Sequence, residues 1–211
     1  MIINESENVY PKKEDSELLL KAAKFAEGRV LDLCTGSGII ALNVAKQAKE
    51  VVAVDINPFA IKSARENAKL NRIKNIKFLK SDLFSRLGGM KFDTIYANPP
   101  YLPGEEHKNW IDYALNGGSE GSEVTLKIIH GLKNHLKRNG CAFMILSSVY
   151  DTGKVYKEIK RLNFSFRRLY SINFFFEELF LIKIYYGKGR NSGKWRKDNS
   201  SSNYKQFRSG T

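Results

Sequence analysis

Cysteine, histidine and long apolar runs are all scarce in this chain of 211 residues. The two cysteines, Cys34 and Cys141, lie in or beside strand-like segments without a metal-ligand spacing, which favours a reduced, cytoplasmic setting. The three histidines form no ligand pattern, and we expect His130 and His135 on the solvated surface of a helix, so no metal site is predicted. The longest apolar runs, such as residues 141–146, have the length of a strand and not of a signal peptide or a membrane span.

Negative charge is also in short supply. The chain has 35 Lys and Arg against 22 Asp and Glu, a net charge of +13. Residues 188–211 hold seven Lys or Arg and one Asp, a net +6 that leaves +7 for the rest. Because this segment lacks apolar periodicity, we predict a catalytic or binding domain over residues 1–187 and a disordered basic tail over 188–211. The tail is either an arm near RNA or a non-native extension, and the remaining +7 either attracts an acidic or ribosome-associated partner or is simply solvated.

Short apolar runs alternate with amphipathic segments along residues 1–187, and no internal repeat is visible. This alternation is typical of an α/β fold with a mostly parallel sheet and helices on both faces. The last two strands have no helix between them and are expected to form an antiparallel hairpin at the end of a seven-stranded sheet. The expected helices cover residues 15–27, 38–48, 58–71, 120–137 and 151–161, and the expected strands 29–33, 51–55, 76–80, 92–97, 140–146, 164–172 and 179–186.

A glycine turn follows the first predicted strand. Gly36 and Gly38 permit positive φ angles and a close approach of a ligand to the backbone. A third glycine is missing, since Ala41 stands in its place, and no phosphate-binding lysine follows, so a nucleoside without a pyrophosphate suits the turn better than a dinucleotide. Asp32 is placed to meet the ammonium of an amino-acid group. The plainer alternative is a strand-to-helix turn whose glycines serve backbone geometry alone.

Two further strands end in a carboxylate. Asp55 closes the second strand about 20 residues after the glycine turn, the position from which an acidic side chain accepts both ribose hydroxyls. Its alternative role as a helix cap is already filled by Asn57, with Pro58 at the first helical position. Asp82 ends the third strand and is placed to accept from an adenine amine, although Asp is frequent at strand ends.

The most informative stretch is Asn98-Pro99-Pro100-Tyr101, directly after the predicted strand 92–97. A planar amide or exocyclic amine has two N–H groups, which the Asn98 side-chain oxygen and the Pro99 carbonyl would accept. The prolines fix φ and hold that carbonyl rigidly, and the Tyr101 ring would stack on the planar group. The pattern fits a site that orients a poorly nucleophilic nitrogen for methylation; its alternative is an ordinary Pro-rich turn.

Together these motifs resemble the Rossmann-like, S-adenosylmethionine-dependent class I methyltransferases. The chain is most similar to the HemK/PrmC family of protein-glutamine N5-methyltransferases, in its short archaeal and eukaryotic branch. Cys34 stands where many methyltransferases carry glycine, and the opening reads Tyr-Pro-Lys-Lys where the branch has Tyr-x-Pro. The segments that carry the resemblance are 9–20, 31–38, 55–58, 81–83, 98–101, 117–121 and 176–179.

The resemblance implies a cofactor, S-adenosylmethionine, and a set of site residues. It implies catalysis by Asn98, Pro99 and Tyr101, with Pro100 joining these three in substrate binding. Cofactor contacts are implied for Tyr10, Asp15, Asp32, Thr35, Gly36, Gly38, Asp55, Ile56, Asp82, Leu83 and Asn98. The implied substrate is the glutamine of a Gly-Gly-Gln loop in a translation release factor, and the implied partner is a small activator subunit that carries its own zinc.

Three other functions remain open from the residues. A nucleic-acid methyltransferase acting on adenine N6 or guanine N2 would use the same Asn-Pro-Pro-aromatic turn, and the basic surface favours it. A protein-lysine methyltransferase is a second alternative, and a non-catalytic cofactor-binding subunit is a third. We expect no additional N-terminal substrate domain, because the glycine turn comes after only about thirty residues, and no recognition domain for nucleic acid is visible.

Overall fold

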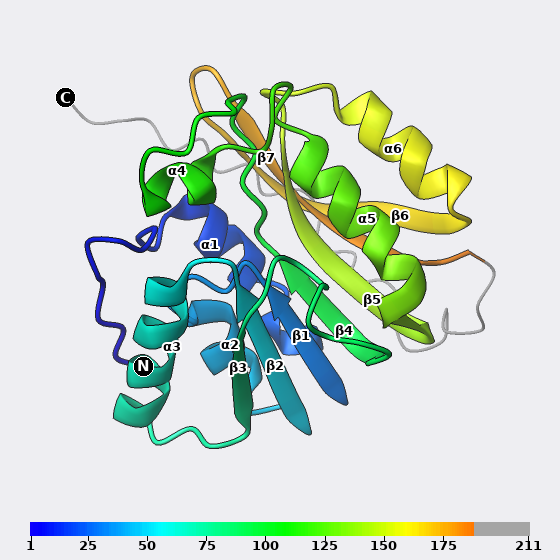
Figure 1. Cartoon of the computed structure of the whole chain (residues 1–211). Helices are drawn as coiled ribbons and strands as arrows, with labels where there is room; N and C mark the ends of the chain where they lie inside the picture. Colours follow the sequence, from blue (N-terminus) through cyan, green and yellow to red (C-terminus); the bar gives the residue numbers. More distant parts are fainter. Residues whose placement is uncertain (188–211) are drawn as a thin grey trace.

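The computed structural model describes residues 1–187, which form a twisted seven-stranded sheet with helices on both faces (Figure 1). The strand order is β3-β2-β1-β4-β5-β7-β6. The first five strands pair in parallel, and β7 runs antiparallel to both β5 and β6. The predicted fold, including the terminal hairpin, is confirmed. The strands are β1 (Arg29–Leu33), β2 (Glu50–Asp55), β3 (Ile76–Lys80), β4 (Phe92–Ala97), β5 (Leu136–Ser147), β6 (Phe164–Asn173) and β7 (Glu178–Tyr186).

The helices divide between the two faces of the sheet. One apolar cluster joins the first three helices to side chains such as Val30 and Val51, and a second joins the fifth and sixth helices to Leu31 and Val52. Neighbouring residues of one strand thus serve opposite cores, as the alternation of side chains along a strand requires. The helices are α1 (Glu14–Leu20), α2 (Ile39–Val44), α3 (Pro58–Leu70), α4 (Trp110–Leu115), α5 (Glu123–His135) and α6 (Thr152–Arg161). None of those in residues 1–187 has the length and apolar character needed to cross a bilayer.

The first helix is shorter than predicted. It ends at Leu20 and is followed by a 3₁₀ turn over Ala23–Phe25, whereas the sequence predicts one helix over residues 15–27. The buried Tyr96 hydroxyl donates to the Ala22 carbonyl at 2.9 Å, and Ala26 N–H donates to the carbonyl of Ala23 instead. The Ala22 carbonyl thus accepts from the Phe25 N–H of the 3₁₀ turn and from Tyr96 of β4, and not from the Ala26 N–H as in a continued α-helix.

His135 is also not where the sequence predicts it. Its side chain is buried at the end of α5, with Nδ1 2.8 Å from the Met90 carbonyl and the ring stacked on Phe84. The expectation of a solvated histidine is wrong because the last turn of α5 packs against the loop between β3 and β4, which holds Phe84 and Met90. His130 does lie on the surface, where it pairs with Glu158.

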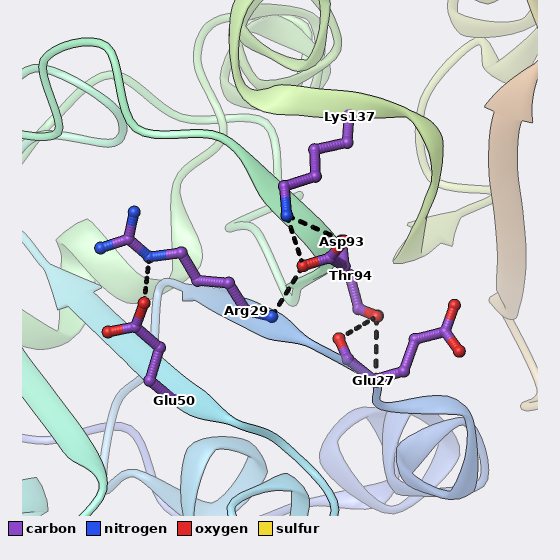
Figure 2. Close-up of polar contacts among 6 residues, drawn as sticks. All are labelled: Glu27, Arg29, Glu50, Asp93, Thr94 and Lys137. Carbon is purple, nitrogen blue, oxygen red and sulfur yellow. Dashed lines mark hydrogen bonds and ion pairs between the residues drawn. The ribbon is translucent and has the colours of Figure 1, made fainter.

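The amino-terminal edge of the sheet is held by polar contacts (Figure 2). The Asp93 carboxylate accepts from the Arg29 backbone N–H at 2.8 Å and from Lys137 Nζ at 2.8 and 3.0 Å, which joins β1, β4 and β5. The Arg29 side chain forms an ion pair with Glu50 of β2 at 2.7 Å. These contacts fix the register of four strands at one edge, and so fix where their carboxyl ends lie at the other.

Candidate active site

A cleft opens at the carboxyl ends of β1, β2, β3 and β4, the edge at which open parallel sheets bind their ligands. The cleft brings together nearly all of the residues that the sequence singles out. Those that line it are Tyr10, Asp15, Asp32, Thr35, Gly36, Asp55, Ile56, Asp82, Leu83, Asn98, Pro99, Pro100 and Tyr101. Gly38 is the one member of the predicted set that does not line it.

Asp32 lies at the end of β1 with only 1% of its surface exposed. One of its oxygens, Oδ2, accepts from the Thr35 hydroxyl at 2.6 Å and from the Ala41 backbone N–H at 3.0 Å. Burial raises the pKa of this carboxyl to about 7, against the lowering effect of those two hydrogen bonds. The side chain therefore ties the glycine turn to the start of α2, and its other oxygen is available to a cationic ligand group.

Asp55 and Gly36 form the next part of the cleft. Asp55 Oδ2 accepts from the Gly36 N–H at 2.9 Å, and Oδ1 accepts from the Asn57 N–H at 2.9 Å. Burial raises the pKa of the Asp55 carboxyl, and these backbone donors oppose the rise. Each carboxylate oxygen has a second lone pair, so a vicinal diol can still be bound by both. Gly36 has φ +55°, and a Cβ there would point into open space, so the turn leaves room for a ligand.

Gly38 allows close packing against Ala64 and does not line the cleft. It caps α2 with φ +85°, and a Cβ at this position would lie 2.9 Å from both the Ala64 Cβ and Leu42 Cδ1. The glycine thus allows α2 and α3 to approach each other closely. Cys34, in the same turn, also has a positive φ of 57°, and burial raises the pKa of its thiol.

Asp82 and Leu83 extend the wall beyond the end of β3. Asp82 is exposed, whereas Leu83 is half-buried in the second core and has a positive φ of 45°. The Ser81 hydroxyl donates to the Leu83 carbonyl at 2.9 Å and holds this turn closed. The acidic side chain and the apolar one therefore face the same cleft from a fixed backbone.

Asn98 presents an acceptor that the protein itself leaves unused. Its Oδ1 atom is buried and has no hydrogen-bond partner among the residues that the structure describes. Pro99 and Pro100, both buried beside it, fix the backbone that follows β4. A buried acceptor without a donor destabilises a fold by about 1–3 kcal/mol, so its presence at the cleft points to a ligand that donates a hydrogen bond.

Tyr101 is held through a second phenol. Its hydroxyl interacts with that of Tyr10, which interacts in turn with the Asp15 carboxylate, so the segment before α1 lies against the loop after β4. Burial, followed by the negative charge of Asp15, raises the pKa of both phenols, which keeps them protonated as donors. The Tyr101 ring is thereby fixed beside Asn98 and the prolines.

Helix α4 is the part of the site that the sequence reading missed. It covers residues where only a loop is predicted, and it contributes Trp110 and Tyr113 to the cleft. The His107 ring contacts Tyr113 at a tilt, with ring centroids 4.2 Å apart. Asn109 and Asp112 form a capping box at its start, with the Asn109 oxygen accepting from the Asp112 N–H at 3.1 Å. The Asn-x-x-Asp spacing of this capping box is the sequence signal that predicts the start of the helix.

One protein-family profile covers most of this chain. The sequence profile of the methyltransferase small domain matches residues 1–172. The chain belongs to this methyltransferase family. The predicted resemblance and the enzymatic nature of the protein are thereby confirmed.

Relatives of this methyltransferase include proteins named for glutamine methylation. A Methanocaldococcus jannaschii protein assigned as a protein N5-glutamine methyltransferase is 40% identical over 182 residues, 84% of this chain and 91% of the relative. The release factor glutamine methyltransferase of Thermodesulfovibrio yellowstonii is 41% identical over 126 residues, 55% of this chain but 45% of that protein. The methyltransferase thus matches nearly all of the archaeal relative and about half the length of the bacterial one.

A solved structure shares the fold. The E. cuniculi Mtq2–Trm112 complex, described as responsible for methylation of the eRF1 termination factor, superposes with a TM-score of 0.69 at 21% identity. The match covers 85% of this methyltransferase and 99% of that chain. At this identity the likeness supports the class I methyltransferase fold.

Proposed function

We propose that this methyltransferase transfers a methyl group from S-adenosylmethionine to the side-chain amide nitrogen of a glutamine in a translation release factor. The observation that carries the proposal is the buried Asn98 oxygen without a partner, beside Pro99 and Tyr101 in the cleft. The glutamine methyltransferases among its relatives favour an amide over the nucleic-acid amine or lysine that the residues alone leave open.

The residues of the cleft fit this cofactor. Asp55 offers two oxygens to ribose hydroxyls, Gly36 leaves space beside them, and the free oxygen of Asp32 suits an amino-acid ammonium. Asp82 and Leu83 suit the adenine ring, the first by accepting from its amine and the second by apolar contact. When bound, S-adenosylmethionine supplies the electrophilic methyl group and the sulfur leaving group.

The remaining task of the protein is to orient the acceptor. Asn98 Oδ1 and the Pro99 carbonyl each accept one N–H of the amide, and the Tyr101 ring packs on its plane. As the nitrogen gives up electron density its N–H groups become stronger donors, so both hydrogen bonds strengthen towards the transition state. Fixed orientation of this kind contributes roughly 7–11 kcal/mol. No general base is needed before transfer, because the surplus proton leaves to water afterwards.

The proposal extends to the setting of the enzyme. We propose that it acts in the cytoplasm, that residues 1–187 form the catalytic domain, and that a small zinc-binding subunit activates it, as the Mtq2–Trm112 pairing suggests. The tail of residues 188–211 lies outside the described residues, and its contact with RNA stays a prediction.

The deciding experiment offers several acceptors to the enzyme with methyl-labelled S-adenosylmethionine. Purified release factor, a variant of it with the Gly-Gly-Gln glutamine replaced, and total RNA are incubated in parallel, with and without a zinc-binding subunit. Label that appears in the release factor and is lost with the glutamine supports the proposal. Label in RNA alone, or in the glutamine-free variant, overturns it.

A further inference from the structure

The turn between β6 and β7 carries three consecutive phenylalanines at the surface. Phe174, Phe175 and Phe176 are 41%, 92% and 89% exposed, and none of them belongs to either apolar core. Phe175 and Phe176 contact each other edge to face, with ring centroids 4.5 Å apart. Turns usually carry Gly, Asn, Asp, Pro or Ser, so nothing in the backbone requires aromatic rings here. Contiguous apolar groups held in water mark an interaction surface.

The turn is rigid at its base. Asn173 and Glu178 are paired across the hairpin, and the Phe174 N–H donates to the Glu177 carbonyl at 2.6 Å. Ser148 reinforces the pair, since its N–H donates to the Glu178 carbonyl at 2.9 Å and its hydroxyl accepts from the Glu178 N–H at 2.8 Å. A surface ordered before binding loses little entropy when a partner docks on it.

The turn is linked to the neighbourhood of Tyr101 through Glu177. The Ser147 hydroxyl, at the carboxyl end of β5, donates to Glu177 at 2.6 Å, directly after the phenylalanines. The Glu177 carboxylate in turn lies close enough to the Tyr101 phenol to act on it electrostatically. Figure 1 shows the hairpin turn rising at the same edge of the sheet as α4. The phenylalanine turn therefore adjoins a residue that acts on Tyr101 at the cleft.

We propose that Phe175 and Phe176 form a docking site for the protein substrate, binding apolar side chains that lie beside the loop carrying the methylated residue. This rests on the proposed function in that the substrate is a folded protein and not a free amino acid or a nucleic acid. The continuity with Glu177 and Tyr101 favours the substrate over a second copy of this chain, which would cover the approach to the cleft.

The test compares F175S/F176S with the wild-type enzyme, both saturated with S-adenosylhomocysteine so that no turnover occurs. Affinity for full-length release factor is measured by calorimetry. We expect Kd to rise about tenfold or more, as for the loss of buried aromatic anchors, with the melting temperature and the affinity for S-adenosylhomocysteine unchanged. The matched control is Leu70→Ser, which replaces another exposed apolar side chain, at the end of α3, and should leave Kd unaltered.

A Kd within about twofold of wild type would overturn the docking site. So would a wild-type dimer that the double substitution converts to a monomer, because the turn would then serve a second copy. If the wild type binds release factor but never methylates it, the proposed function fails while the docking site stands. If it neither binds nor methylates the factor, both fall.

Discussion

Asn98 shows how a side chain that we propose for catalysis can be unhelpful to folding. Its oxygen is buried without a donor among residues 1–187, and a penalty of about 1–3 kcal/mol for the buried acceptor follows. In the proposed function, an N–H of the substrate amide removes that penalty, and only in the complex. The site is therefore stabilised by its substrate.

Replacing Asn98 by alanine should lower kcat by about 10²–10³-fold, the usual loss for one donor or acceptor that acts in the transition state. The melting temperature should stay the same or rise slightly, because the unpaired oxygen is gone. Labelled-methyl transfer and thermal unfolding check the two parts. Asn43→Ala is the control, since the Asn43 amide bonds only within its own helix and to Met1. A variant that keeps more than half of the wild-type rate would refute the role given to Asn98.

Asp32 should make stability depend on pH. Burial raises its folded-state pKa from 3.8 to about 7, so over that interval the folded protein holds a proton that the unfolded chain has released. Stability of the wild type therefore falls as pH rises from 3.8 to about 7. Asp32→Asn keeps an oxygen for Thr35 and Ala41 but does not titrate. Its stability relative to wild type should increase through this range, by about 1.4 kcal/mol for each unit of pKa difference, and level off above it.

Urea unfolding of both proteins at about pH 5 and pH 8 measures this difference. Since only the carboxylate titrates, a stability difference that does not change with pH would show that Asp32 titrates normally.

Among the helices, the start of α2 lies close to Ala64 of α3 because position 38 is glycine. Gly38→Ala should destabilise the fold by about 1–3 kcal/mol through overpacking, with a further 1–2 kcal/mol or so from the positive φ. The Cβ of Gly36→Ala points into open space, so this variant should be destabilised only by the roughly 1–2 kcal/mol that the positive φ costs. It should also bind S-adenosylhomocysteine more weakly. Urea midpoints and calorimetry separate the two variants. The reverse order of stability would mean that Gly38 does not set the helix spacing.

The sequence predicts some elements better than others for physical reasons. β1, β3 and β4 have the predicted bounds because each is a short apolar run closed by turn residues. Helix α4 has only six residues and owes its existence to capping and to ring contacts of Trp110, which a periodicity reading does not register. The early end of α1 depends on Tyr96, 74 residues away along the chain from Ala22.

The residues of the cleft likewise differ in how far the sequence alone predicts their place. Residues that meet the cleft through their own strand end, such as Asp32, Asp55 and Asn98, are placed by strand order alone once the sheet is parallel. Gly38 cannot be assigned this way, because only the distance to Ala64 shows that its missing side chain serves packing.

For the molecule as a whole, the charge is divided between the described domain and the residues beyond it. A chain ended after Gly187 loses a net +6 of the total +13. We expect it to keep its melting temperature and its methylation of release factor within about twofold, while its affinity for RNA falls and becomes less dependent on salt. Unfolding scans, methyl transfer and RNA binding at two salt concentrations check this. Loss of protein methylation would place the tail within the catalytic domain.

The position of β7 has a consequence for synthesis. It fills the slot between β5 and β6, although it follows both in sequence, and its central residues Leu181, Ile182 and Ile184 are fully buried. Until β7 emerges from the ribosome, the nascent chain has two strands with open edges and both cores incomplete. The sheet therefore closes only after residues 178–186 have left the exit tunnel, and until then the unfinished protein is a natural client for chaperones.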